Sequence, residues 1–220
     1  MPAVAIDGPA GAGKSTIARA VAKKIGYIYV DTGALYRAIG LYMLDHGVSI
    51  HTPEEVKAKL PELQVDLAFE NGEQKVLLCG EDVSGKIRTP EVSMAASAVS
   101  AVPAVREFLF SLQKEIARKH NVIMDGRDIG TVVLPEAQVK IFLTASPEER
   151  ARRRCDELKE KGIPTAYEDV LKDIKERDYQ DSHREIAPLV PAEDAILVDT
   201  TGNTLEQSIR QLAAIIEERI

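Results

Sequence analysis

The segment Gly8-Pro9-Ala10-Gly11-Ala12-Gly13-Lys14-Ser15 constrains the fold more than any other part of the chain. It fits the pattern GxxxxGK[ST], and it stands between a short apolar run at 3–7 and a stretch at 15–25 with helical apolar spacing. Such glycines let successive backbone N–H groups and a helix N-terminus point at a phosphate chain. The sequence therefore predicts a phosphate-binding loop (P-loop) between a strand and a helix. A chance match is the alternative, and this strand-loop-helix context makes it rare.

The loop predicts a site for a nucleoside triphosphate, ATP, together with Mg²⁺. Lys14 is expected to reach the β- and γ-phosphates, and the Ser15 hydroxyl is expected to bind Mg²⁺. The residues expected to contact ATP are Gly8, Pro9, Ala10, Gly11, Ala12, Gly13, Lys14, Ser15 and Thr16. The chain lacks the Asn-Lys-x-Asp motif expected of a switch GTPase. A kinase also needs a second anion site for its acceptor.

Further short β-prone runs alternate with helical patterns along the chain. The runs are at 27–30, 122–124, 139–143 and 195–198, and the helical patterns include 34–45, 147–161 and 167–184. Strands that alternate with helices form a parallel sheet covered on both faces. The prediction is a three-layer α/β P-loop NTPase fold with a parallel five-stranded core sheet.

One stretch departs from this alternation. Two β-prone runs, 64–70 and 75–80, flank Asn71-Gly72, the strongest short hairpin signal. Helices are expected at 92–101 and from Pro103 onward, where proline suits a first helical turn. We expect one kinase domain with a core (about 1–59, 103–146 and 185–220), a small antiparallel acceptor-binding insertion (about 60–102) and a helical lid (about 147–184).

Two groups of polar residues follow predicted strands, at the edge where open α/β sheets bind ligands. Asp31-Thr32-Gly33 is followed by Tyr36 and Arg37, and Arg37 is a candidate phosphate ligand. A helix cap by Thr32 together with a surface arginine explains this first group equally well. The second group is Asp125-Gly126-Arg127-Asp128, in which Asp125 is a candidate for the magnesium shell, as is Asp31, through water.

Arginines recur on both of the charged helical patterns. Arg150, Arg153 and Arg154 share a helix face and are candidates for closing over the transferring phosphoryl group. A solvated face paired with Glu148 and Glu149 is the alternative. On the second helix the residues at i, i+4 and i+7 are Arg177, Asp181 and Arg184. A structural ladder of ion pairs is the alternative there.

Together these motifs closely resemble the bacterial cytidylate kinase family. The matching segments span the chain from end to end: Ile6-Asp7 with the P-loop, Asp31-Thr32-Gly33-Ala34-Leu35-Tyr36-Arg37, Gly80-Glu81-Asp82-Val83-Ser84, Asp125-Gly126-Arg127-Asp128-Ile129-Gly130-Thr131-Val132-Val133 and Ala187-Pro188-Leu189. The hairpin insertion is also characteristic of that family. Tyr179-Gln180 and Ser182-His183 stand where the family usually has a basic or polar tract.

The resemblance implies transfer of the γ-phosphoryl of ATP to CMP or dCMP, and it implies roles for particular residues. Ser97, Arg106 and Asp128 would read cytosine, whose N4 amine suits a carboxylate acceptor. Asp181 and Arg184 would hold the sugar hydroxyl. The acceptor phosphate would be held by Arg37, Arg127 and Arg177.

Composition limits the other functions that the chain can have. The 220 residues are 45% apolar and carry a net charge of -7, so a globular domain is expected and polymeric nucleic acid is not an expected partner. The sequence shows no apolar run of membrane-spanning length and no charged leader before residue 3, which predicts a cytoplasmic protein without a membrane partner. We expect a monomer.

Two other functions stay open on the sequence alone. One is a related kinase for UMP, AMP or a non-nucleotide such as shikimate. The other is a nucleotide-binding switch or assembly ATPase, in which the arginines would serve a protein partner.

Overall fold

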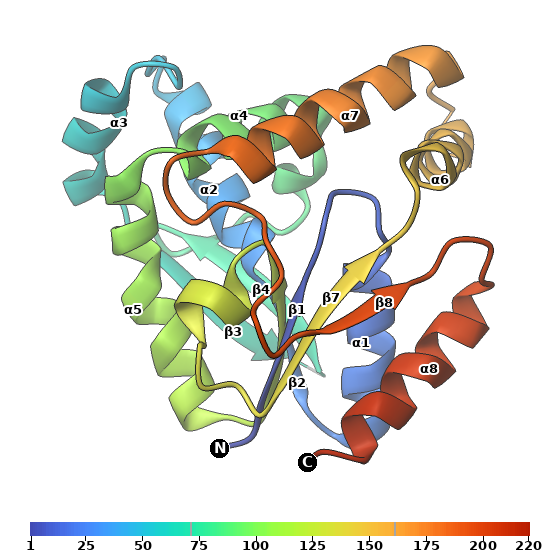
Figure 1. The fold of residues 1–220 in the computed structure, drawn as a ribbon. Coiled ribbons are helices and arrows are strands. Elements are labelled where there is room, and N and C mark those ends of the chain that lie inside the picture. Colours follow the sequence, from blue (N-terminus) through green and yellow to red (C-terminus); the bar gives the residue numbers. More distant parts are fainter. Residues whose placement is uncertain (71, 161) are drawn as a thin grey trace. The chain divides into compact units, whose positions relative to one another are not determined.

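The computed structural model describes residues 1–70, 72–160 and 162–220 and divides into two compact units (Figure 1). The first unit comprises Met1 and Ile28–Val122, and the second comprises Pro2–Tyr27 and Ile123–Ile220. Asn71 of the predicted hairpin turn and Lys161 at the predicted helix end lie outside the described residues. The division into core, insertion and lid stays a prediction.

The larger sheet has five strands in the order β2-β6-β1-β7-β8. Their bounds are β1 (Ala3–Asp7), β2 (Ile28–Asp31), β6 (Val122–Gly126), β7 (Val139–Thr144) and β8 (Ile196–Asp199). β7 pairs in parallel with β1 on one side and with β8 on the other. All five residues of β1 are buried, which explains why the first four of them are apolar. The predicted parallel five-stranded sheet is confirmed.

The second unit places helices α1 (Lys14–Ile25) and α8 (Leu205–Glu217) side by side (Figure 1). α8 begins with a capping box in which the Thr204 hydroxyl accepts the Gln207 N–H and the Gln207 side chain accepts the Thr204 N–H. A π-helix, Ile129–Val133, follows β6.

Helices α6 (Pro147–Glu160) and α7 (Tyr167–His183), also of the second unit, pack on each other. Their shared contact is a small apolar cluster of Ala151, Leu158, Val170 and Ile174. Most of the remaining surface of both helices is charged, which explains the heavily charged helical patterns in the sequence.

The first unit consists of helices packed with a small antiparallel sheet. The helices are α2 (Thr32–Asp45), α3 (Pro53–Lys59), α4 (Pro90–Ser100) and α5 (Pro103–Lys119), with short 3₁₀ helices at Leu60–Glu62 and Lys86–Arg88. The sheet has the order β3 (Val65–Glu70), β4 (Glu73–Leu78) and β5 (Glu81–Asp82). Thr89 caps α4 by accepting the Val92 N–H, and Pro90 occupies its first turn. The predicted small antiparallel sheet is confirmed.

The remaining helices and strands agree with the predicted runs to within a few residues. α3, α8 and β5 were not predicted from the sequence.

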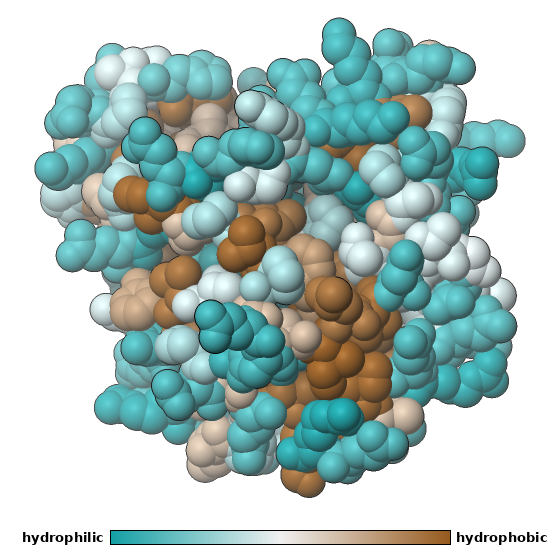
Figure 2. Space-filling view, viewed as in Figure 1, coloured by the Kyte–Doolittle hydropathy of each residue, from teal (hydrophilic) through white to brown (hydrophobic). Residues whose placement is uncertain are grey.

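Figure 2 shows apolar side chains gathered in the region of β8, the edge strand, where Leu197 is 67% exposed.

A search of the described residues finds no single helix that is both long and apolar enough to cross a membrane. α4 and α5 meet the length and composition criteria only as a pair bent by 99°.

Candidate functional site

The P-loop joins β1 to α1 in the second unit, and its glycines are needed for its shape. Gly8 has a φ of 150°, and a Cβ there would lie 1.9 Å from the carbonyl oxygen of Leu143. Gly13, the residue before α1, takes the left-handed conformation with a φ of 87°. Because both positions exclude ordinary side chains, the loop can bring its backbone N–H groups close to a phosphate chain.

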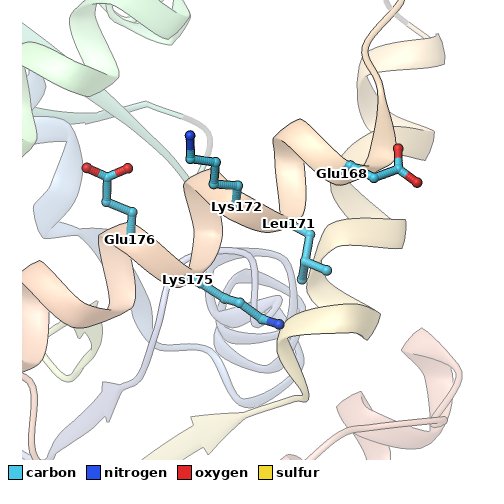
Figure 3. Close-up of a pocket in the computed structure, with 5 residues that line it drawn as sticks. All are labelled: Glu168, Leu171, Lys172, Lys175 and Glu176. Atoms are coloured by element: carbon cyan, nitrogen blue, oxygen red, sulfur yellow. The ribbon is translucent and has the colours of Figure 1, made fainter.

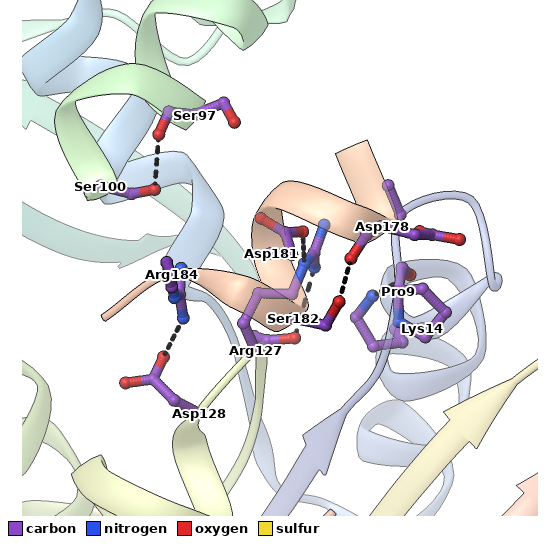
Figure 4. Close-up of polar contacts among 12 residues, drawn as sticks. Pro9, Lys14, Ser97, Ser100, Arg127, Asp128, Asp178, Asp181, Ser182 and Arg184 are labelled. Carbon is purple, nitrogen blue, oxygen red and sulfur yellow. Dashed lines mark hydrogen bonds and ion pairs between the residues drawn. The ribbon is translucent and has the colours of Figure 1, made fainter. Parts of the chain in front are cut away.

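Lys14 lies beneath this loop with 6% of its surface exposed. Its Nζ donates a hydrogen bond to the carbonyl oxygen of Pro9 at 2.7 Å (Figure 4). Burial, and after it the charge of Arg127, lower the pKa of Lys14 to about 7. Two cations, Lys14 and Arg127, thus act on one region of the P-loop, where they can bind anionic phosphates.

Ser15 and Asp125 provide oxygen atoms of the kind that Mg²⁺ prefers. The Ser15 hydroxyl donates to Oδ2 of Asp125 at 2.8 Å, and Asp125 is buried at the end of β6. Among the described residues no cluster of acidic, histidine or cysteine side chains could hold a metal ion alone. Mg²⁺ commonly takes only one or two protein ligands and completes its shell with substrate phosphates and water. The Ser15–Asp125 pair fits this mode of binding.

The loop after β6 and the C-terminal half of α7 carry a cluster of arginines and aspartates (Figure 4). Arg127 Nε donates to Oδ2 of Asp181 at 2.8 Å, and Nη2 of Arg184 lies 3.7 Å from Oδ1 of Asp128. Burial alone would raise the pKa of Asp181, but Arg127, Arg177 and Arg184 outweigh it and keep that pKa below its ordinary value. Five of the predicted site residues, from two segments of the sequence, thus interact in one place in the second unit.

The chain just after α7 holds the end of this cluster. Arg184 Nε donates to the carbonyl oxygen of Ala187 at 2.6 Å, and the Leu189 N–H donates to the carbonyl oxygen of Asp181 at 2.8 Å. Ala187 has a φ of 49°, which is unfavourable for a non-glycine residue. The conformation of Ala187-Pro188-Leu189 therefore orients Arg184 at the cost of local backbone strain.

Of the three arginines of α6 that were predicted as site residues, two contact the P-loop region and one does not. Arg150, 3% exposed, donates from Nη1 to the carbonyl oxygen of Ala10 at 3.0 Å and makes a two-pronged pair with Asp178. Arg153 donates to the carbonyl oxygen of Thr200 at 2.9 Å, and a Cβ on Gly13 would lie 3.9 Å from Arg153 Nη1. Arg154 pairs with Glu157 on the exposed side of the helix.

Replacing Asp178 with alanine is expected to lower the free energy of unfolding by about 3 kcal/mol, because it leaves the buried Arg150 charge without its partner. Urea unfolding followed by circular dichroism measures the change. The matched control is Asp173→Ala on an exposed position of the same helix, expected to cost less than about 0.5 kcal/mol. Equal stability losses for the two variants would contradict a structural role for the pair.

The first unit contains a second group of the predicted residues at the start of α2. Asp31 caps α2 by accepting the Ala34 N–H at 3.0 Å and pairs with Arg37 at 2.7 Å and with Arg88 at 3.4 Å. Gln74 of β4 donates to the Asp31 carbonyl and accepts the Asp31 N–H. The alternative of a helix cap by Thr32 is therefore wrong, because Asp31 is the capping residue and also pairs with Arg37. Thr32 is the buried first residue of α2.

Tyr36, Ser97 and Arg106 lie where α2, α4 and α5 of the first unit meet. The Arg106 guanidinium lies 5.6 Å from the centre of the Tyr36 ring, and its Nη1 donates to the carbonyl oxygen of Ser100 at 3.2 Å. The Ser100 hydroxyl in turn donates to the carbonyl oxygen of Ser97 at 2.8 Å (Figure 4). Contacts thus connect all three predicted positions.

An open hollow of about 550 Å³ lies along α7, lined by Glu168, Leu171, Lys172, Lys175 and Glu176 (Figure 3). Its lining comes from one helix and includes none of the predicted site residues. The hollow therefore does not coincide with the candidate site.

Some residues that organise the site were not among the sequence candidates. Asp178 holds Arg150, Gln74 and Arg88 contact Asp31, and Asp7 accepts two backbone N–H groups from the segment after Asp128. Only Asp7 had a signal in the sequence, as a carboxylate ending an otherwise apolar strand. The others act through contacts with partners that no local pattern identifies.

These features define a P-loop nucleotide-binding protein. They are the parallel sheet, the P-loop between β1 and α1, the buried lysine under that loop and the serine paired with a carboxylate. The model of the family described as cytidylate kinase matches residues 4–218. The chain belongs to the cytidylate kinase family, as its motifs predicted.

Two relatives and one solved structure indicate how close the similarity is. The cytidylate kinase of Caldicellulosiruptor saccharolyticus is 53% identical over 95% of this chain and 92% of its own length. The cytidylate kinase of Carboxydothermus hydrogenoformans is 52% identical over 97% of this chain and 96% of its own length. A crystal structure of an uncharacterized protein from Eubacterium ventriosum covers 100% of both chains with a TM-score of 0.53 at 10% identity, a likeness of fold alone.

Proposed function

We propose that this protein transfers the γ-phosphoryl group of ATP to CMP or dCMP, with ADP and CDP or dCDP as products. Besides its membership of the cytidylate kinase family, one observation supports the proposal most directly. The Ser15 hydroxyl, next to the P-loop lysine in the sequence, donates to Asp125, so the loop that carries Arg127 two residues later lies at the P-loop. A phosphotransferase needs a second anion site next to its triphosphate site, and Arg127 with its partners supplies one.

The donor nucleotide is held by the P-loop in this proposal. Backbone N–H groups of the loop bind the phosphates, and Lys14 neutralises the β- and γ-phosphate oxygens. Ser15 would bind Mg²⁺ directly, and Asp125 would fix its shell. Bound there, Mg²⁺ neutralises charge on the β- and γ-oxygens.

In this proposal the acceptor nucleotide is held by the residues for which the family resemblance implies that role. Arg37, Arg127 and Arg177 bind its phosphate, which suits the forked donors of guanidinium groups. Ser97, Arg106 and Asp128 read the cytosine, and Asp181 and Arg184 bind the sugar. Tyr36, Thr32 and Asp31 support Arg37 at the start of α2.

The chemical step needs positioning and charge neutralisation, and no side chain becomes covalently modified. An oxygen of the acceptor phosphate forms a bond to the γ-phosphorus while the bond from that phosphorus to the β–γ bridging oxygen breaks, and ADP leaves with this oxygen. Arg153 of α6 neutralises the transferring group, and Arg150 holds the loop at Ala10. Water exclusion by α6 and α7 limits ATP hydrolysis.

A panel of acceptors tests the proposed function. ADP formation, measured in a coupled assay with ATP and Mg²⁺, is expected with CMP and dCMP, and at rates about tenfold or more lower with UMP, AMP and shikimate. ADP formation without acceptor is expected to be negligible, because a kinase excludes water. Steady ATP or GTP hydrolysis with no phosphorylated product would instead indicate a switch or assembly ATPase. Transfer to UMP, AMP or shikimate alone would indicate a related kinase.

We further propose that the enzyme acts in the cytoplasm, because its substrates are soluble nucleotides. We also propose that it is a monomer. Sedimentation at micromolar concentration tests the oligomeric state, and a dimeric mass would contradict it.

A further inference from the structure

Asp7 is a buried carboxylate that none of the proposed substrate contacts uses. It is the last residue of β1, 5% exposed, and both of its carboxylate oxygens accept hydrogen bonds from backbone N–H groups of the π-helix. Oδ1 accepts from Ile129 at 2.8 Å and Oδ2 accepts from Gly130 at 2.7 Å. A buried charge with two well-directed donors is costly to place, so its presence calls for a function.

The two N–H groups belong to the residues that directly follow Arg127 and Asp128. The backbone is therefore fixed by Asp7 immediately after the two side chains assigned to the acceptor phosphate and base. Space at this contact is also limited, because a Cβ on Gly130 would lie 3.4 Å from Asp7 Oδ2 and 3.3 Å from Lys140 Cγ. The loop between β6 and the π-helix thus fits tightly against the Asp7 side chain.

We propose that Asp7 is a positioning residue for the acceptor, because its carboxylate holds the loop that presents Arg127 and Asp128 to CMP. This inference rests on the proposed function of the two loop residues. Asp7 itself touches neither substrate. It acts on the acceptor through the backbone of Ile129 and Gly130.

The backbone of the donor site does not depend on the Asp7 side chain, whose charge acts there only by raising the pKa of Lys14. The backbone of β1 is fixed by its parallel pairing with β7, in which Asp7 stands opposite Phe142. Gly8 packs directly on the Leu143 carbonyl. Because these backbone contacts remain when the side chain is changed, replacing Asp7 should affect the acceptor more than ATP.

Acid pH should weaken the same contact. Burial raises the pKa of Asp7 to about 6, and the charge of Asp128 adds to this, while the two N–H donors and Lys14 oppose it. Near Gly130, Lys140 contributes its side-chain carbons to this site, and its ammonium pairs with Asp194. Below pH 6 the protonated carboxyl accepts hydrogen bonds from the two N–H groups more weakly. The difference in KM for CMP between the wild-type enzyme and an Asp7 variant should therefore become smaller.

The test compares Asp7→Asn and Asp7→Ala with the wild-type enzyme. Asparagine keeps one acceptor oxygen and alanine keeps none, so we expect the KM for CMP to rise about tenfold in Asp7→Asn and more in Asp7→Ala. The KM for ATP should change by less than about twofold. The matched control is Ile141→Val, a core substitution in β7 that removes one methyl group and leaves every hydrogen-bond acceptor in place.

Several outcomes would overturn the inference. If both KM values rise by the same factor, as a general loss of stability would cause, Asp7 is merely structural. An unchanged KM for CMP in Asp7→Asn would also overturn it. If Asp7→Ala fails to fold, Asp7→Asn still decides the question through its KM values. Failure of the wild-type enzyme to phosphorylate CMP would instead overturn the proposed function.

A pH series gives a readout that a merely structural role would not change. The ratio of the KM for CMP in Asp7→Asn to that in wild type should be about tenfold near pH 7.5 and fall to about threefold near pH 5.5, where about a quarter of the Asp7 carboxyl is still ionised. Taking the ratio removes the titration of the CMP phosphate itself. A ratio that stays constant across this range would contradict a role for the ionised carboxylate.

Discussion

Replacing Lys14 with alanine is expected to lower kcat for phosphoryl transfer to CMP by about 10³-fold or more. Lys14 is the buried cation beneath the P-loop, and its Nζ is held at the carbonyl oxygen of Pro9. Negative charge on the β- and γ-phosphate oxygens is present in the ground state and shifts during transfer, so the loss should appear mainly in kcat. Initial rates over a range of ATP and CMP concentrations separate kcat from the two KM values.

A lysine on the same helix provides the matched control for Lys14. Lys23→Ala removes an exposed charge from the last turn of α1 and should change kcat by less than about twofold. Circular dichroism and thermal unfolding should show that Lys14→Ala is folded. The depressed pKa of Lys14 means that the folded protein disfavours the lysine charge, so its removal should not unfold the protein. A Lys14→Ala enzyme within tenfold of the wild-type kcat would refute its role in catalysis.

The parts of the fold that were predicted correctly are those fixed by local sequence. β1, the P-loop and α1 follow from an apolar run, a glycine pattern and a helical repeat that lie next to each other in the chain. α8 was not predicted, although Thr204 and Gln207 form a capping box at its start. No predicted site motif lies beside this capping box in the sequence. β5, with two residues, is too short for any periodic pattern.

The contacts that organise the site could not be predicted in this way. Arg150 reaches Asp178 and the Ala10 carbonyl across 28 and 140 residues of sequence, respectively. Helical spacing gave Arg150, Arg153 and Arg154 one face, yet Arg150 is buried and Arg154 pairs with Glu157 on the surface. Asp7 binds backbone groups of Ile129 and Gly130, which no side-chain pattern displays. Long-range partners of this kind depend on the tertiary fold.

Replacing Asp128 with alanine is expected to remove most of the preference for CMP over UMP. In the proposed complex the carboxylate accepts a hydrogen bond from the N4 amine of cytosine, whereas uracil presents an oxygen acceptor at that position. kcat/KM for CMP should fall by about 100-fold, since the amine loses a buried charged partner, while that for UMP should change by less than about tenfold. Rates with the two acceptors under identical conditions give the selectivity directly.

Two further variants separate base reading from a general loss of acceptor binding. Asp128→Asn can turn its amide N–H toward the uracil oxygen, so we expect the ratio of CMP to UMP activity to fall at least as far as in Asp128→Ala. Asp181→Ala removes a carboxylate assigned to the sugar, which CMP and UMP share, and should lower both activities by the same factor. Since Asp128 also pairs with Arg184, a general effect of the lost ion pair would lower activity with the two acceptors equally. Equal losses in Asp128→Ala would therefore show that Asp128 orders Arg184 and does not read the base.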